Sequence, residues 1–215
     1  MYANRKNPIE TQPIAMEILL SLSRCVRAFT ATQVAAGFFA GNGQKASRLL
    51  TSLVSQKLAV QTRVPVREIP ASQNPLVTWR VGAEAPKFDS LVVKIRDRWQ
   101  SAPTKVTSIY LAGPVATRLL GYETAGRLKR PLQASHDIGL AGVYLAVRRD
   151  RPELAKFWFG EDVAPKQTGS VPDAIYIDAD GRTSLAFEFC GLYSVNRLRS
   201  FHHHCAERRL RYELW

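Results

Sequence analysis

Two short apolar segments joined by an Asp-Gly pair constrain the fold of this chain more than any other feature. They run from Ala174 to Asp178 and from Thr183 to Cys190, and Asp180-Gly181 lies between them. An Asp-Gly pair between two such segments is typical of a β-hairpin, because these residues adopt the left-handed backbone that a tight turn needs. The sequence therefore predicts an antiparallel hairpin that extends from Pro172 to Cys190.

Each strand of the predicted hairpin carries one carboxylate. Asp173 precedes the first strand and Glu188 lies near the end of the second, so antiparallel pairing brings both to the same end of the hairpin. Two carboxylates so placed could share one Mg²⁺, which would orient a phosphate and activate a water for phosphodiester cleavage. The alternative is that Asp173 takes part in turn chemistry and that Glu188 pairs with an arginine, because short patterns of this kind occur freely.

A third candidate for the same site is His136. It lies in the first turn of a helix that we expect Ser135 to cap, and its imidazole could bond a phosphate or a water beside the two carboxylates. The alternative is a capping histidine whose bonds are satisfied within the protein. The neighbouring Asp137 suits the first turn of a helix for dipole reasons alone.

The cysteines and a run of histidines argue against a disulfide framework and a structural zinc site. Cys25, Cys190 and Cys205 are widely spaced and contain no CxxC pair. In the run His202 to Cys205, only the first and last side chains would share one face of a helix. No segment is apolar and long enough to span a bilayer, so we expect no membrane partner. The cysteine pattern, with an N-terminus that lacks an apolar signal region, predicts a reducing cytoplasmic location.

The charge balance favours a polyanionic partner. The 215 residues have room for two small domains, and 30 Lys and Arg against 18 Asp and Glu give a net charge of +12. Residues 1–100 hold 14 of the basic and 6 of the acidic residues, a surplus of +8, whereas residues 101–215 contribute +4. Because neutralised phosphates release counterions, this surplus favours nucleic acid over an ordinary basic surface.

The first 86 residues have the element order of a winged helix-turn-helix. Apolar spacing predicts three helices and then two extended segments that pair as a wing. Thr30 and Gln33 fit a capping box at the start of the second helix. The five elements are expected at residues 13–27, 30–38, 44–56, 59–66 and 76–81.

The third helix and the wing carry the candidate DNA-contacting residues. In a helix-turn-helix this helix enters the major groove, and small and basic side chains suit that position. The candidates are Lys45, Ser47, Arg48 and Ser52 on the helix, with Arg63 and Arg67 on the wing. The alternatives are a solvated helix face and a module that docks a protein rather than double-stranded DNA.

The predicted fold class is α+β, with two domains joined by one helix. Residues 1–86 form the winged helix-turn-helix, residues 87–103 form a linking helix with one apolar stripe, and residues 104–215 form an α/β domain. Besides the hairpin, the second domain is expected to contain a strand at 106–111, helices at 114–120, 135–147, 152–159 and 194–208, and a last strand at 210–215 that pairs with the hairpin.

Together these features resemble a known family. A winged helix-turn-helix, a helix that opens with His and a Pro-Asp-containing hairpin that ends in Glu-Phe look like the replication-relaxation family of plasmid and mobile-element proteins. The second half is similar to the PD-(D/E)xK nuclease superfamily, which implies a restriction-endonuclease-like fold. The resemblance is carried by residues 136–148, 172–191 and 193–215, including the run Glu188-Phe-Cys-Gly-Leu-Tyr193.

The resemblance implies DNA binding in plasmid replication, mobilisation or its control, with metal-dependent nicking as a further activity. Carried over by position, Asp173 and Glu188 would be the metal carboxylates, and Mg²⁺ would be the cofactor. The nuclease pattern has a lysine two residues after the Glu, where this chain has Cys190. A thiol does not stabilise a pentavalent phosphate as an ammonium does. Other residues that could supply this charge are Lys166, Arg197 and His202.

Three hypotheses follow. The first is a DNA-binding protein of a plasmid, mobile element or defence locus, with a nuclease-like domain whose catalysis is lost or weakened. The second is an active Mg²⁺-dependent endonuclease or nickase that its winged helix targets. The third is an adaptor that docks a replication or transfer protein. Recognition of a palindromic DNA site would add a homodimer to the first two.

Overall fold

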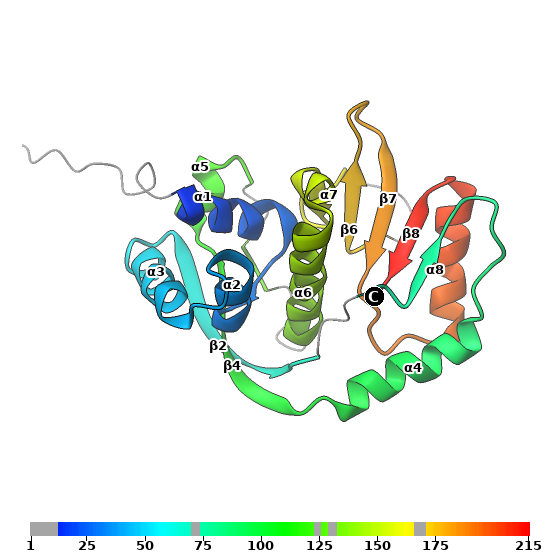
Figure 1. Ribbon diagram of the computed structural model, residues 1–215, viewed down its shortest axis with the longest axis horizontal. Coiled ribbons are helices and arrows are strands. Elements are labelled where there is room, and N and C mark those ends of the chain that lie inside the picture. The colour runs from blue at the N-terminus through cyan, green and yellow to red at the C-terminus, as the bar shows by residue number, and fades with distance from the viewer. Residues whose placement is uncertain (1–12, 70–73, 123–125, 129–132, 166–170) are drawn as a thin grey trace, which may run out of the picture.

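The computed structural model describes residues 13–69, 74–122, 126–128, 133–165 and 171–215. These residues form helices and two separate β-sheets, so the predicted α+β class is confirmed. A three-stranded sheet lies with the first helices at one end of the molecule, and a five-stranded sheet lies at the other (Figure 1). We call the first part (residues 13–69 and 104–122) the N-terminal unit and the second (residues 74–101 and the described part of 133–215) the C-terminal unit. No helix in these ranges is long and apolar enough to cross a membrane.

The first helices of the N-terminal unit start at local capping signals. The elements are α1 (Pro13–Leu20), a π-helical turn η1 (Ser21–Cys25), β1 (Phe29–Thr30), α2 (Ala31–Phe38) and α3 (Gly43–Ser55). The predicted capping box is confirmed, because the Thr30 hydroxyl accepts a bond from the Gln33 amide and the Gln33 side chain accepts one from the Thr30 amide. Asn42 caps α3 by accepting a bond from the Lys45 amide at 2.9 Å.

The sheet of the N-terminal unit corrects the predicted wing. β2 (Ala59–Arg67) pairs along its whole length with β4 (Thr104–Ala112), and β1 pairs with the other edge of β4. β3 (Val77–Trp79) lies instead in the second sheet, where Trp79 stacks on Tyr212. The hairpin predicted from residues 59–66 and 76–81 is therefore wrong, because β2 finds in β4 a partner of its own length and β3 buries its tryptophan elsewhere.

The chain leaves the N-terminal unit after β2 and returns to it at β4. Between them it adds β3 and the predicted linking helix, α4 (Phe88–Ser101), to the C-terminal unit. The apolar stripe of α4 packs with α8 (Val195–Glu207) in one hydrophobic cluster. The strand predicted at residues 106–111 is present as β4, but it lies in the first sheet and not with the hairpin. Each unit is therefore built from two separate stretches of chain: β3 and α4 of the C-terminal unit lie between β2 and β4 of the N-terminal unit.

The C-terminal unit contains the predicted hairpin in a sheet of order β3-β8-β7-β6-β5. β6 (Ala174–Ile177) and β7 (Thr183–Glu188) pair antiparallel, and Gly181 has a φ of +76° in the turn between them. The predicted last strand is β8 (Arg211–Leu214), which runs parallel to β7 because α8 connects the two. The helix predicted at 152–159 ends early, since α7 (Pro152–Lys156) is followed by β5 (Trp158–Gly160), which pairs with β6.

Helix α6 (Ala134–Asp150) lies between the two sheets and is buried on most sides, whereas the short α5 (Pro114–Leu119) follows β4 (Figure 1). Ser135 does not cap α6 as predicted, because the helix has already begun at Ala134. The Ser135 hydroxyl instead accepts a bond from the Arg67 amide of β2 at 2.9 Å. Gly139 allows α6 to approach the hairpin closely, since a Cβ at this position would lie 2.1 Å from the Phe189 ring.

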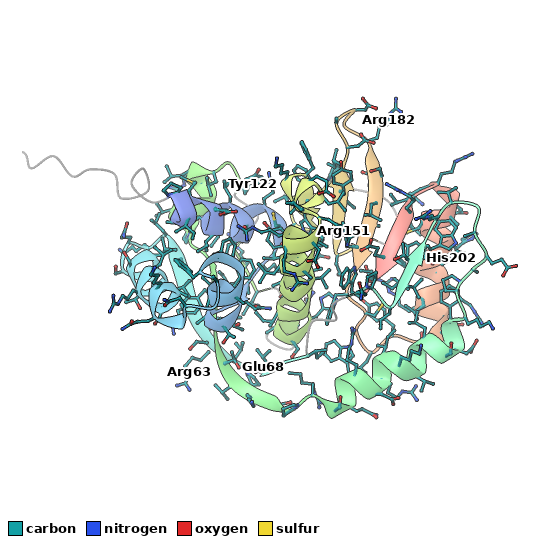
Figure 2. All side chains as sticks on the ribbon, viewed as in Figure 1. Arg63, Glu68, Tyr122, Arg151, Arg182 and His202 are labelled. Carbon is teal, nitrogen blue, oxygen red and sulfur yellow. The ribbon has the colours of Figure 1, made fainter. Side chains whose placement is uncertain are left out.

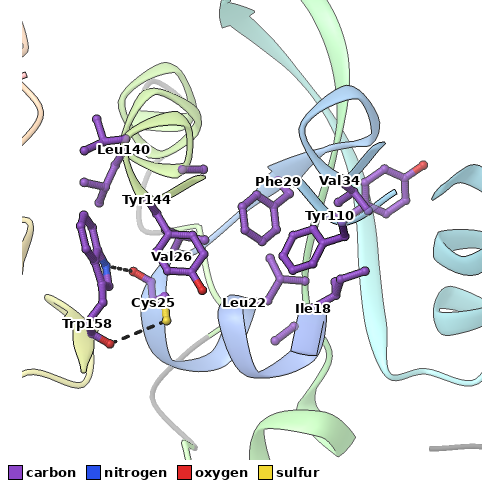
Figure 3. Close-up of a cluster of buried hydrophobic side chains, with 14 of the residues drawn as sticks. Ile18, Leu22, Cys25, Val26, Phe29, Val34, Tyr110, Leu140, Tyr144 and Trp158 are labelled. Carbon is purple, nitrogen blue, oxygen red and sulfur yellow. Dashed lines mark hydrogen bonds between the residues drawn. The ribbon is translucent and has the colours of Figure 1, made fainter. Parts of the chain in front are cut away.

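One hydrophobic cluster runs through both units. Phe29 and Tyr110 from the first sheet, Tyr144 from α6 and Trp158 from the second sheet all belong to it (Figure 3). Trp158 stacks on Phe187 with 4.2 Å between ring centres, and its indole donates a hydrogen bond to the Cys25 carbonyl. Because this core is continuous, the two units pack directly against each other, and α6 contributes residues to the packing between them.

Candidate functional site

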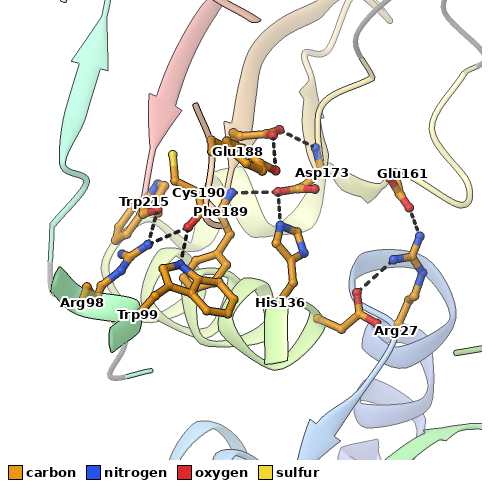
Figure 4. Close-up of polar contacts among 12 residues, drawn as sticks. Arg27, Arg98, Trp99, His136, Glu161, Asp173, Glu188, Phe189, Cys190 and Trp215 are labelled. Carbon is orange, nitrogen blue, oxygen red and sulfur yellow. Dashed lines mark hydrogen bonds and ion pairs between the residues drawn. The ribbon is translucent and has the colours of Figure 1, made fainter. Parts of the chain in front are cut away.

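The hairpin brings the two predicted carboxylates together. The register that pairs Ala174 with Phe187 places Asp173 and Glu188 side by side at one end of β6 and β7 (Figure 4). The Glu188 carboxylate accepts a hydrogen bond from the Asp173 amide at 3.2 Å, and the Asp173 carboxylate accepts one from the Phe189 amide at 2.8 Å. Both are shielded from solvent, since Glu188 is 1% exposed and Asp173 is 8% exposed.

His136 reaches this pair from the first turn of α6. Its Nε2 lies 3.2 Å from Oδ2 of Asp173, and its ring meets the edge of Phe189 with 5.5 Å between centres. The structure thus places all three candidate catalytic residues in one cluster. Their convergence depends on the approach of α6 to the hairpin that Gly139 permits.

Tyr193 is a fourth member of the cluster, which we call the carboxylate site (His136, Asp173, Glu188 and Tyr193). Its hydroxyl donates a hydrogen bond to Oε1 of Glu188 at 2.9 Å from the loop between β7 and α8. A single tyrosine in a loop has no periodicity, so the sequence gives no signal for this contact beyond closeness to Glu188. Burial, and then the charge on Glu188, raises the pKa of the Tyr193 phenol, which therefore stays protonated as a donor.

Two groups of the carboxylate site, His136 and Glu188, have pKa values above their ordinary ones. Burial lowers the pKa of His136, but the charge on Asp173, with smaller effects from Glu188 and Asp137, raises it overall to about 9. Burial raises the pKa of Glu188, and the charge on Asp173 raises it further. At neutral pH the imidazolium of His136 therefore supplies the positive charge beside Asp173.

A second buried ion pair adjoins the carboxylate site. Asp137, next to His136 on α6, is 2% exposed and accepts a bond from Nη1 of Arg27 at 2.9 Å. Arg27 lies just before β1 in the N-terminal unit and also contacts Asp162, at 2.7 Å, and Glu161. The sequence explains Asp137 only through the helix dipole, because its partner lies 110 residues away. Arg27 thus ties the N-terminal unit to the helix that carries His136.

The donor atoms of the carboxylate site fit Mg²⁺ poorly. Both oxygens of Glu188 and Oδ2 of Asp173 already accept protein hydrogen bonds, and His136 supplies the charge beside Asp173. Mg²⁺ requires near-octahedral oxygen ligands and usually keeps several waters, which these closed contacts leave little room for. Within the described ranges, no three His, Cys, Asp or Glu side chains are placed to hold a metal ion.

The position of the missing lysine is closed as well. Cys190 has no exposed surface, and its carbonyl accepts bonds from Arg98 and from the Trp99 indole (Figure 4). Burial, together with the charge on Glu188, raises the pKa of the Cys190 thiol, so it stays uncharged at neutral pH. The Cys190 position therefore supplies no cation and is closed to solvent.

Of the other residues that could supply a cation, Arg197 and His202 both lie on α8 but have different partners. Arg197 lies beside the carboxylate site, with its guanidinium carbon 5.6 Å from the centre of the Tyr193 ring. His202 instead bonds the Tyr212 hydroxyl at 2.9 Å, in the contact between α8 and β8. Lys166 lies outside the described residues.

The predicted DNA-contacting residues fall into two groups. Four of them are exposed and have no side-chain partner among the described residues: Lys45, Ser47 and Arg48 on α3 and Arg63 on β2. Figure 2 shows Arg63 at the surface of the N-terminal unit. The other two have partners. The Ser52 hydroxyl accepts a bond from Gln56, and the Arg67 guanidinium donates to the Trp99 and Ala102 carbonyls at the end of α4.

Arg63 and α3 lie on the same side of the first sheet. Side chains of alternate residues share one face of a strand, so Ala59 and Arg63 project to the same side of β2. Ala59 packs in the hydrophobic cluster with Val34 of α2 and Leu50 of α3. Arg63 continues that face into solvent, so the exposed part of β2 and the outer face of α3 flank one surface.

The elements that form this surface carry no carboxylate, although Glu68 directly follows β2, is exposed and accepts a bond from the Thr107 hydroxyl of β4. Residues 18–67 and 98–122 contain no Asp or Glu but ten Lys and Arg, and they include α2, α3, β2 and β4. Such a segregation of charge concentrates positive potential on one unit. We call the exposed face formed by α3 and β2 the basic face.

Comparison with models of protein families, with curated proteins and with solved structures finds no match for this chain. The resemblance to the replication-relaxation family therefore remains a hypothesis that rests on the residues that suggested it.

Proposed function

We propose that this protein binds double-stranded DNA through the basic face, as a winged helix-turn-helix does. The observation that carries the proposal is the absence of any Asp or Glu from residues 18–67 and 98–122, which hold the cations of α3 and β2. The element order helix, short strand, two helices and then the long strands β2 and β4 also suits that class, with α3 in the major groove and the β2–β4 ladder as the wing. In this proposal Arg67 orients the wing on α4 and does not contact phosphate.

We further propose that the C-terminal unit descends from a nuclease and has lost or weakened its catalysis. The hydrogen bonds that occupy its carboxylates, the burial of Glu188 and the neutral Cys190 all support this view. The retained contacts of the carboxylate site would then stabilise the packing of the hairpin against α6. A role in a plasmid, a mobile element or a defence locus follows from the family resemblance.

The second candidate function is an active Mg²⁺-dependent endonuclease. The convergence of His136, Asp173 and Glu188 favours it, since such clusters are typical of catalytic sites. An active enzyme would have to open the Tyr193 contact and free the carboxylate oxygens before a metal ion could bind. The third candidate, an adaptor for a replication or transfer protein, would need no DNA affinity.

A gel-shift titration on duplex DNA of random sequence tests the binding proposal. We expect affinity that falls steeply with salt, and a salt slope that drops by about one for Arg63→Ala. Arg182→Ala is the matched control, because Arg182 is exposed at the turn of the β6–β7 hairpin, away from the basic face (Figure 2). Weak binding at low salt would reject the proposal and favour the adaptor.

Incubation with supercoiled plasmid in Mg²⁺ or Mn²⁺ tests the state of the C-terminal unit. We expect the wild type to shift the plasmid without nicking it. Nicking by the wild type that Glu188→Ala and Asp173→Ala both abolish would establish the second candidate instead. The gel shift and the nicking assay are independent, so failure of one proposal leaves the other standing.

A further inference from the structure

We propose that Gln44 and Arg48 select the DNA site by binding the major-groove edges of an adenine and a guanine. This inference rests on the proposed binding of DNA by α3 and goes beyond it by naming the bases. Of the two residues, Gln44 is not among the candidates that basic charge alone suggests.

The geometry of α3 singles out these two side chains. Ala46, Leu50 and Leu53 are its buried residues and define its inner side. With about 100° of rotation per residue, positions 44 and 48 lie opposite that side, in the middle of the outer face. Lys45 and Ser47 fall on its two flanks, where they would face the walls of a groove and not its floor.

Gln44 and Arg48 are also free to bind. Both are exposed, and neither side chain makes a hydrogen bond or an ion pair within the described part of the chain. They lie in the first two turns of α3, and the N-terminal residues of a recognition helix are the ones that contact base edges. By contrast, the Ser52 hydroxyl accepts a bond from Gln56 and is half-buried.

The chemistry of the two side chains identifies the bases. The NH₂ group of a Gln side chain donates a hydrogen bond to N7 of adenine, and its amide oxygen accepts one from the N6 amino group. Gln therefore fits adenine with two bonds. An Arg guanidinium donates two bonds to O6 and N7 of guanine. Residues four apart on a helix are about 6 Å apart, and base pairs are stacked about 3.4 Å apart, so the two bases should lie one or two steps from each other.

Selection of bound sequences from a randomised duplex library tests the inference with the full-length chain. We expect the wild type to enrich sites that hold an adenine and a guanine one or two steps apart. Gln44→Ala should lose the preference at the adenine, and Arg48→Ala should lose it at the guanine. Each loss of discrimination should be roughly 5- to 150-fold, the range of one good bidentate pair.

Two further variants separate base contacts from charge. Arg48→Lys keeps the charge but loses the planar fork, so it should retain the salt slope and still lose the preference for guanine. Lys45→Ala should weaken binding to all sequences about equally and leave the selected site unchanged. The three substituted positions, Gln44, Lys45 and Arg48, are all exposed, so unchanged melting temperatures would show that each variant is folded.

The outcomes of these experiments distinguish base selection by Gln44 and Arg48 from the proposed binding of DNA through the basic face. Salt-dependent DNA binding with no selected site, or a selected site that survives Gln44→Ala and Arg48→Lys, would overturn the inference and leave DNA binding intact. Absence of binding to any duplex at low salt would overturn both.

Discussion

Nε2 of His136 lies 3.2 Å from Oδ2 of Asp173, so the first turn of α6 is joined to the start of β6 by a buried ion pair. The next residue on α6, Asp137, pairs with Arg27 of the N-terminal unit. One helical turn therefore holds both units through charged contacts. The stability of the fold should depend on the protonation of the first pair and on the cation of the second.

Stability is expected to fall as the pH rises from about 6.5 to above 9. The pKa of folded His136 is about 9, above its ordinary value of 6.5, so its contribution is complete below pH 6.5 and is lost as the pH rises through 9. The raised pKa of Glu188 acts in the same direction, because its ionised form is unfavourable in the fold. Urea unfolding between pH 6 and 10 should show a decline on the order of 1–3 kcal/mol.

His136→Ala should flatten this decline, since it removes the titrating imidazole. His203→Ala is the matched control, because His203 is an exposed histidine on α8, and it should preserve the wild-type profile. If both variants decline with pH as steeply as the wild type, another group is responsible.

Glu188→Gln is expected to preserve or raise stability at pH 8, by about 1 kcal/mol. An amide resembles the protonated carboxyl that the raised pKa favours, and Tyr193 can keep a hydrogen bond to it. Asp173→Asn should instead destabilise, because it removes the charge that pairs with His136. Thermal melts of the two variants at pH 8 check the contrast, and a larger loss for Glu188→Gln than for Asp173→Asn would reverse our view of which carboxyl is charged.

Arg27→Ala is expected to destabilise the protein by about 3–5 kcal/mol, because it leaves buried Asp137 without its cation. Arg149→Ala removes an arginine from an exposed pair with Asp150, and it should leave the unfolding free energy unchanged. Urea titrations at pH 7 measure both. If both variants changed the unfolding free energy by the same small amount, the contact of Arg27 with Asp137 would not stabilise the packing of the two units.

The parts of the fold that the sequence predicts are those that neighbouring residues determine. The Asp-Gly turn fixes the β6–β7 hairpin, and Thr30 with Gln33 fixes the start of α2, because each signal and its effect lie within a few residues. The pairing of β2 with β4 spans an insertion of 36 residues that belongs to the other sheet. No local pattern distinguishes that partner from β3, which lies closer along the chain.

The same division holds for the carboxylate site. Asp173 and Glu188 meet because the register of one hairpin sets their distance, so the sequence predicts their contact. The contacts of Asp137 with Arg27 and of Arg98 with the Cys190 carbonyl join residues about a hundred positions apart, and only tertiary packing brings them together. The hydrogen bonds that the oxygens of Asp173 and Glu188 accept argue against a Mg²⁺ site, and only the structure shows them.

Cys190→Lys, which restores the lysine of the nuclease pattern, is expected to destabilise the protein and to produce no cleavage. The Cys190 side chain packs among Leu198 and Phe201 of α8, and an ammonium placed there would lose its hydration without gaining an anion that is free to pair. Cys190→Met is the matched control, because it adds similar length without charge, and it should lower the melting temperature less. Plasmid nicking in Mg²⁺ by the folded Lys variant but not by the Met variant would mean that the site lacks only its lysine, and that the hydrogen bonds to Glu188 and Asp173 open readily enough for a metal ion to enter.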